Sequence, residues 1–155
     1  MKSVFQAIAI IAMTFALIAC GKKDSRKNIY GDVDGPTTMV EVGDREMEAA
    51  IQKAEDTLPD FIAELKDPRG REFSIKSPFK TDSGKYEHMW VMWVVYADGK
   101  FKGKLGNSPV DIKKMKVGDT VVVDRDDVSD WIIMDGDNML GGYTAKLLME
   151  REKKN

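Results

Sequence analysis

Residues 88–105 read HMWVMWVVYADGKFKGKL, and this stretch predicts a β-hairpin. It contains two runs with a period of two that are rich in β-branched and aromatic residues, as strands are. Asp98-Gly99 separates the runs, and glycine accepts the positive φ that a type I′ hairpin turn requires. We therefore expect antiparallel strands at residues 88–97 and 100–105.

The two expected strands differ in what their faces carry. The first is apolar on both faces, with Trp90, Met92 and Val94 on one and Val91, Trp93 and Val95 on the other. One face can pack under a helix, and the other must meet a C-terminal helix, residues 31–42 or another molecule. The second strand has a row of lysines on one face, at Lys100, Lys102 and Lys104. Such a row is typical of an edge strand that is protected against aggregation.

Further strands are expected on both sides of the hairpin, at residues 71–77, 120–124 and 128–134. Apolar residues recur at three- and four-residue steps from Asp44 until Asp67-Pro68, which predicts a long helix with Asp44 as its N-cap. Pro59 lies inside this pattern and should kink or split the helix, with Thr57 as the cap of a second segment.

The C-terminal residues 143–153 predict a short helix with its charges toward solvent. The expected fold class is therefore α+β. It comprises an antiparallel sheet of about five strands, a long N-terminal helix with a proline kink, and a short C-terminal helix.

Composition limits the chain to one packed domain, because 155 residues with 43% hydrophobic content do not supply two cores. The chain has a net charge of −2 and therefore lacks the excess of basic residues that is typical of a nucleic-acid-binding protein. Cys20 is the only cysteine, so the rest of the chain has no disulfide and no thiolate ligand or nucleophile. The sequence predicts no cofactor.

The first residues are typical of an exported lipoprotein. A basic start at Lys2 precedes an apolar run at residues 4–17, which is shorter than the roughly 20 residues of a membrane-spanning helix. The run ends in LIAC at residues 17–20, which resembles the bacterial lipobox. We expect a signal peptide at residues 1–19, a lipidated Cys20 with a tether and irregular lead-in at 20–43, and one globular domain at 44–155. The alternative is an uncleaved anchor helix with a chance cysteine.

Lipid on Cys20 would make the membrane a partner, since two or three acyl chains give effectively permanent attachment where one is marginal. Gly21 follows the cysteine, where an aspartate tends to hold enterobacterial lipoproteins at the inner membrane. This favours the outer membrane, facing the periplasm, over the inner membrane.

Five motifs carry a resemblance to a known family. They are Trp93, GKLGNSP at residues 103–109, VGDTV at 117–121, VSDW at 128–131 and GGYT at 141–144. In this order they resemble the bacterial family named domain of unknown function 2314, over most of residues 46–148. The resemblance implies a fold but no activity, and the joining of some members to ankyrin repeats implies protein binding. Related sequences tend to have arginine near Lys146, so a bidentate contact is not implied there.

The polar residues predict neither a catalytic nor a metal site. His88 is the only histidine, so a three-histidine zinc site is excluded and a structural role is expected. Aspartates cluster at residues 124–130 and at 135–137. Paired acids can bind calcium or cleave glycosides, and the alternative is that these residues serve turns and N-caps. The segment 135–138 lacks the spacing of a calcium loop and predicts a hairpin turn instead.

A candidate binding region remains where Asp130-Trp131 is expected to lie near the GGYT loop. Its candidate binding residues are Asn107, Asp130, Trp131, Tyr143 and Thr144. Glycines allow close backbone approach, and the polar side chains could contact a ligand. The alternative is a capped strand end with Trp131 in the core.

These observations support three functional hypotheses. The first is a membrane-anchored envelope module that binds a partner protein. The second is an inhibitor or immunity-type protein that neutralises a toxin or an enzyme. An envelope hydrolase is the third and has the least support, and we expect that the chain is not an enzyme.

Overall fold

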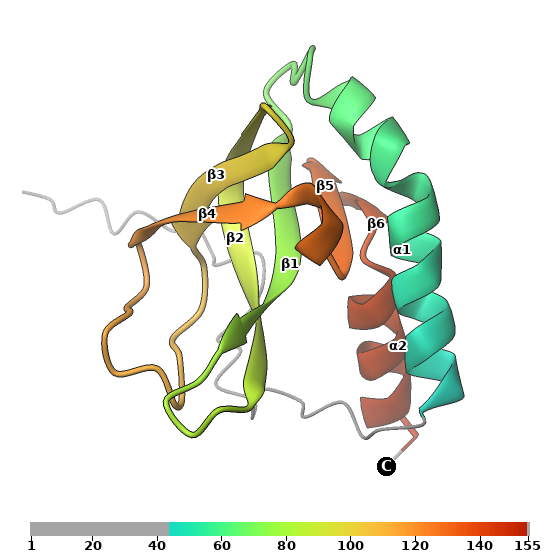
Figure 1. The fold of residues 1–155 in the computed structure, drawn as a ribbon. Coiled ribbons are helices and arrows are strands. Elements are labelled where there is room, and N and C mark those ends of the chain that lie inside the picture. The colour runs from blue at the N-terminus through green and yellow to red at the C-terminus, as the bar shows by residue number, and fades with distance from the viewer. Residues whose placement is uncertain (1–43, 155) are drawn as a thin grey trace, which may run out of the picture. The chain divides into compact units, whose positions relative to one another are not determined.

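The computed structural model describes residues 44–154, which form a six-stranded antiparallel sheet with two helices (Figure 1). The strand order is β4-β3-β2-β1-β5-β6. The helices are α1 (Arg45–Glu64) and α2 (Tyr143–Glu152), and a short 3-10 turn, η1, spans Arg125–Asp127. The strands are β1 (Glu72–Lys80), β2 (Tyr86–Ala97), β3 (Lys100–Leu105), β4 (Thr120–Asp124), β5 (Asp130–Asp135) and β6 (Asn138–Gly141). The α+β class is confirmed, with six strands where about five were expected.

Helix α1 begins where the sequence predicts. The Asp44 carboxylate accepts a hydrogen bond from the backbone N–H of Met47 at 3.1 Å, as an N-cap does. A kink or a split was expected at Pro59, and the helix continues through this residue without a split. Thr57 caps no second segment, because its hydroxyl donates back to the Lys53 carbonyl at 2.7 Å.

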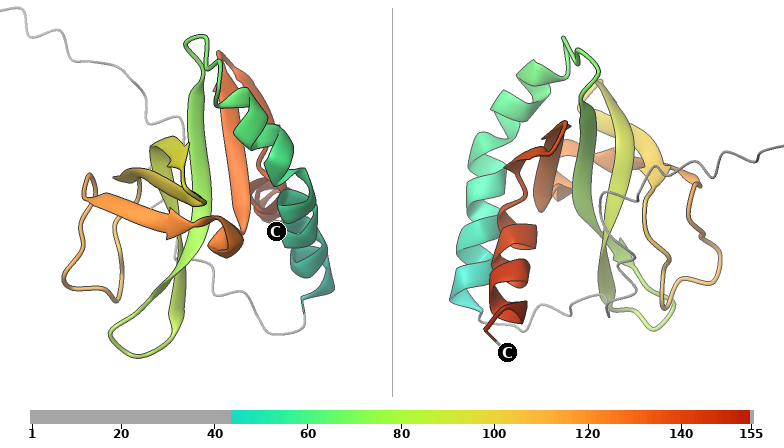
Figure 2. Two further views of the ribbon diagram at one scale, coloured as in Figure 1. Left: turned by 45° about the horizontal axis from the view of Figure 1, so that its top comes forward. Right: turned by 180° about the vertical axis from the view of Figure 1, so that it is seen from behind.

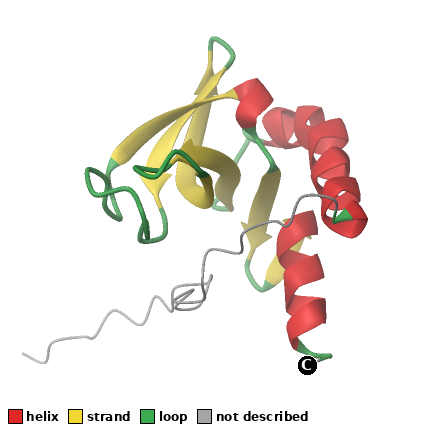
Figure 3. Cartoon of the chain, turned by 60° about the horizontal axis from the view of Figure 1, so that its bottom comes forward, coloured by secondary structure: helices red, strands yellow, loops and turns green. Residues whose placement is uncertain are grey.

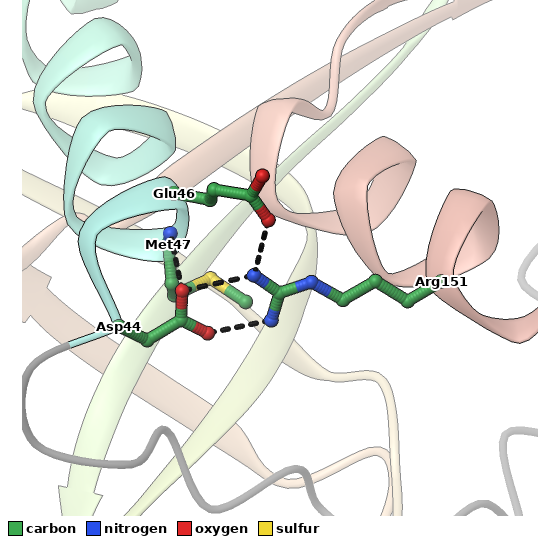
Figure 4. Close-up of polar contacts among 4 residues, drawn as sticks. All are labelled: Asp44, Glu46, Met47 and Arg151. Atoms are coloured by element: carbon green, nitrogen blue, oxygen red, sulfur yellow. Dashed lines mark hydrogen bonds and ion pairs between the residues drawn. The ribbon is translucent and has the colours of Figure 1, made fainter.

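The two helices lie side by side next to β5 and β6, while β3 and β4 project away on the other side (Figures 2 and 3). Ion pairs connect the end of α2 to the start of α1. The Arg151 guanidinium of α2 contacts the Asp44 carboxylate at 2.5 Å and the Glu46 carboxylate at 2.8 Å (Figure 4). Among residues 44–154, neither helix combines the length and apolar character needed to cross a membrane.

The main core lies between α1 and the facing side of the sheet. Phe61 of α1 is fully buried, and its ring lies 5.6 Å from Phe73, 6.0 Å from Phe101 and 5.3 Å from Trp131, measured between ring centroids. These rings come from β1, β3 and β5, so one helical side chain bridges much of the sheet. A second cluster joins Met89, Leu105 and Ile112 at the other end of the hairpin strands.

The β2–β3 hairpin has the predicted bounds at its turn. Asp98 and Gly99 both have positive φ, 51° and 75°, as a type I′ turn requires. The expectation that the lysine strand forms an edge is wrong, because β4 pairs along the whole of β3. Two of its three lysines contact polar side chains on β4: Lys100 forms an ion pair with Asp124, and Lys104 donates to the Thr120 hydroxyl at 2.7 Å.

The edges of the sheet are β4 and β6. Strand β6 was not predicted, since its four residues are too few to show a period. The predicted turn at residues 135–138 is confirmed, as it joins β5 to β6 with Gly136 at a positive φ of 58°.

Candidate binding groove at the Trp93 bulge

The predicted candidate residue Asp130 is an internal cap. Its side chain is fully buried, and its carboxylate accepts from the backbone N–H groups of Tyr143 at 3.1 Å and Thr144 at 2.9 Å. The Thr144 hydroxyl donates to it at 2.6 Å. Gly142 stands at the N-cap of α2 and has no side chain to offer, so a carboxylate from β5 satisfies the exposed N–H groups of that helix.

A half-buried lysine lies near this carboxylate, and a half-buried histidine lies near that lysine. Lys76 is the cross-strand partner of Asp130, and its ammonium lies 3.4 Å from the Thr144 hydroxyl and 5.6 Å from the centre of the Trp90 ring. Burial lowers the pKa of Lys76, and the charge of Asp130 opposes that shift. His88 shares a hydrogen bond of 3.0 Å with Ser129, and its pKa is lowered by burial and then by the charge of Lys76. These polar groups are thus used inside the fold.

Trp131 is a core residue, as the structural alternative predicted. Its side chain is 6% exposed, and its indole N–H donates to the Ala54 carbonyl and the Thr57 hydroxyl, each at 3.1 Å. The backbone at Gly141 approaches it so closely that a Cβ there would lie 2.3 Å from the Trp131 carbonyl oxygen. The first glycine of the GGYT motif is therefore explained by packing.

The two remaining candidate residues also have internal contacts. The Tyr143 ring meets Trp131 edge-on, with the ring centroids 5.8 Å apart, and its hydroxyl lies 3.3 Å from the Thr57 hydroxyl. Asn107 accepts a hydrogen bond from the Trp90 backbone N–H at 2.8 Å. The structure thus brings four of the five candidates together and uses Asn107 to hold β2. Ligand binding by this set stays a prediction.

The aspartate clusters form no evident cation site. Within the described part of the chain, no group of three or more His, Cys, Asp or Glu side chains is arranged to hold a metal ion. Residues 125–127 form the short turn η1, where aspartates are common.

A β-bulge in β2 creates a feature that the sequence did not reveal. Between the pairs Met92–Lys104 and Val95–Lys102 the register shifts, so that β2 has two residues opposite Gly103 of β3. The first of these, Trp93, has a φ of +51°, a region where a bulky residue is an outlier. Gly103 allows this arrangement, because a Cβ there would lie 2.6 Å from the Met92 carbonyl oxygen.

The bulge changes which β2 side chains are buried. Met89 and Val91 are fully buried, and the next inward residue is Val94 at 4% exposure. The expected placement of Val94 on the face of Trp90 and Met92 is therefore wrong, since the extra residue reverses the alternation. Trp93 and Val95 are left exposed, at 59% and 61%.

These two side chains border an apolar groove of about 460 Å³. Its walls are Ile62 of α1, the C-cap residue Leu65, Phe73 of β1 and Trp93, Val95 and Tyr96 of β2. Charged groups at its border are Lys66, Arg71 and Glu72. Its volume lies within the range of ligand sites and its lining is mainly apolar, which makes the groove a candidate binding site. The available signal was the second apolar face of this strand, for which cover by another molecule was one of the alternatives, but nothing in the sequence indicated the bulge.

Comparison with known proteins places this α+β domain in a family. The chain belongs to the family described as "Uncharacterized protein conserved in bacteria (DUF2314)", whose model matches residues 44–155. It is 33% identical over 103 residues to the "Uncharacterized protein YegJ" of Escherichia coli (strain K12), covering 66% of this chain and 67% of that protein. The resemblance drawn from the five motifs is thus confirmed.

A second relative is a Neisseria meningitidis serogroup B protein that is named for ankyrin repeats. It is 31% identical over 124 residues, which are 74% of this chain. The match spans about half of the Neisseria protein, 49% of its length. No solved structure matches the chain at a significant level.

Proposed function

We propose that this chain is a lipid-anchored protein of the bacterial envelope whose domain binds a partner protein through the Trp93 groove. The main support for this binding site is the left-handed backbone conformation of Trp93 and the exposure of its side chain. A left-handed backbone costs an L-residue roughly 1–2 kcal/mol, and strain of this kind is concentrated at functional sites. Tryptophan is also the residue type most enriched among those that dominate interface affinity.

The relative named for ankyrin repeats supports a role in protein binding, because ankyrin repeats build extended binding surfaces. An inhibitor or immunity-type protein would be one form of the same function, with a toxin or an enzyme as its partner. We propose binding rather than catalysis because the groove walls are apolar and contribute no nucleophile with an adjacent base.

The lipid anchor is tested by Cys20→Ser. A serine hydroxyl cannot replace the thiol that receives the lipid, so the variant should accumulate as an uncut precursor without incorporated radiolabelled palmitate. The wild type should be shortened and labelled. Normal processing of Cys20→Ser would contradict the lipoprotein proposal.

The proposed location in the outer membrane is tested by density-gradient fractionation of the envelope. We expect the wild type with the outer membrane, and Gly21→Asp should move the protein to the inner membrane. A wild type found in the inner membrane, or an unchanged distribution of the variant, would contradict the proposed location.

The binding site is tested by capture of partners from detergent-solubilised envelopes with the full-length protein as bait. Trp93→Gly removes the indole but keeps a residue that tolerates the backbone conformation. Leu140→Ala is the matched control, because Leu140 is 41% exposed on β6 and does not line the groove. A partner held through the groove should be lost with Trp93→Gly and retained with Leu140→Ala. Equal capture by both variants would exclude the groove.

A further inference from the structure

We infer that the groove receives an extended segment of the partner, which adds as a strand to residues 93–97 of β2. This inference rests on the proposed binding function and specifies its mode. The occupant is an apolar peptide segment that carries one acidic and one basic side chain.

The first argument is the backbone of β2. Pairing between β1 and β2 ends at Ser74 and Met92, and beyond this point the described strands pair with β2 only through β3. Ala97 and Lys100 flank a two-residue turn and form a hydrogen-bonded pair, so Val95 and Lys102 form the next one.

In an antiparallel ladder the intervening residue directs its backbone groups the other way. Tyr96 therefore turns its N–H and C=O away from β3, toward the side where the groove lies. An extended segment can pair with these groups, as in other complexes formed by strand addition. A helix placed in the groove would leave them without that pairing.

The second argument is the shape and polarity of the walls. Side chains of a strand alternate between two sides. On one side an added segment would meet Ile62 and Leu65 at the end of α1, and on the other it would lie beside Trp93 and Val95. Both sides are apolar, so apolar side chains can be buried at successive positions of the segment.

The third argument is charge. Arg71 is already occupied, since its guanidinium lies 2.7 Å from the Glu64 carboxylate. Lys66 and Glu72 border the groove with opposite charges, and within residues 44–154 neither forms an ion pair. A bound segment with one acid and one base complements both groups.

The experiment selects random peptides displayed on phage against the full-length protein in detergent micelles. Selected peptides should contain a run of apolar residues together with one acidic and one basic residue. Trp93→Gly should weaken their binding at least about tenfold, as loss of an interface anchor does, whereas Leu140→Ala should leave it unchanged. Lys66→Glu should weaken it too, and more so at low salt.

Amide hydrogen exchange then separates the mode of binding from the site. With a selected peptide bound, the Tyr96 amide should exchange at least about tenfold more slowly, because a new hydrogen bond protects it. Peptides that need Trp93 but leave Tyr96 exchange unchanged would overturn strand addition and leave the binding function intact. Failure to select peptides, or equal binding to Trp93→Gly, would overturn both. A dimer that Trp93→Gly dissolves would assign the groove to a second copy of the chain instead of a partner.

Discussion

Asp130 shows how much one buried carboxylate can organise. It accepts hydrogen bonds from four backbone N–H groups and one hydroxyl, and these donors belong to β5 and to the start of α2. Asp44 has the same chemistry at α1, and it was predictable because a cap lies next to its helix in sequence. Asp130 caps a helix 13 residues downstream, a distance at which the sequence offered only the general expectation of a capped strand end.

We expect Asp130→Asn to lower the free energy of unfolding by about 3 kcal/mol, because the amide nitrogen would face donors that the carboxylate now satisfies. Urea denaturation measures this loss. Asp135→Asn, at an exposed position on β5, is the control and should stay within about 0.5 kcal/mol of the wild type. A stable Asp130→Asn variant would show that the cap contributes little.

The tryptophans at positions 93 and 131 should respond in opposite ways to truncation. Trp131→Ala should cost about 3–5 kcal/mol, since it removes a core ring and leaves a cavity. Trp93→Gly should keep the free energy of unfolding within about 1 kcal/mol, because relief of left-handed strain offsets the entropy cost of glycine. Thermal unfolding checks both. A large loss in Trp93→Gly would mean that its ring stabilises the fold and would weaken the case for a binding role.

At the scale of elements, prediction succeeded where the cause is local. The Asp98-Gly99 turn set the hairpin, and the helical period set α1. It failed where the cause lies on a neighbouring strand. The lysine row of β3 is typical of an edge, yet β4 covers that edge. The alternation in β2 predicted correctly which side chains share a face as far as Trp93, where one extra residue turns Val94 inward. The candidate groove could not be predicted for the same reason.

Gly103→Ala tests whether the bulge depends on the strand opposite it. The added methyl would lie 2.6 Å from the Met92 carbonyl oxygen and 2.8 Å from a Val91 methyl, so the two strands must move apart. We expect a loss of about 1–3 kcal/mol in unfolding free energy, typical of overpacking. Lys102→Ala, on the exposed face of β3, is the control for a change on the same strand. Wild-type stability of Gly103→Ala would show that the bulge tolerates a side chain there.

Over the whole domain, the strand order joins segments that are distant in sequence. β1 lies between β2 and β5, and its pairing with β5 brings residues 72–76 against 130–134. No local pattern indicates such a pairing, because it depends on how the whole sheet buries its face against α1. The contact between the helices is also distant in sequence. Arg151 of α2 binds Asp44 at the start of α1, and the two residues are 107 positions apart.

This last contact should make the stability of the domain depend on acid. The hydrogen bonds from Arg151 and then from the Met47 N–H lower the pKa of Asp44 from 3.8 to about 2. Between these values the unfolded chain takes up a proton that the folded protein does not, so acid favours unfolding. The stabilisation is complete above about pH 4 and is lost as the pH falls toward 2.

Urea denaturation of the wild type and Asp44→Asn over a series of pH values tests this expectation. The difference in unfolding free energy between them should be constant above about pH 4 and should shrink toward pH 2. Added salt should reduce it, because both side chains are partly exposed and their charges are screened. The lowered pKa of His88 also weakens the fold, as the pH drops below 6.5, but it acts in both proteins and cancels in the difference. A difference that stays constant down to pH 2 would show that the ion pair does not hold the two helices together.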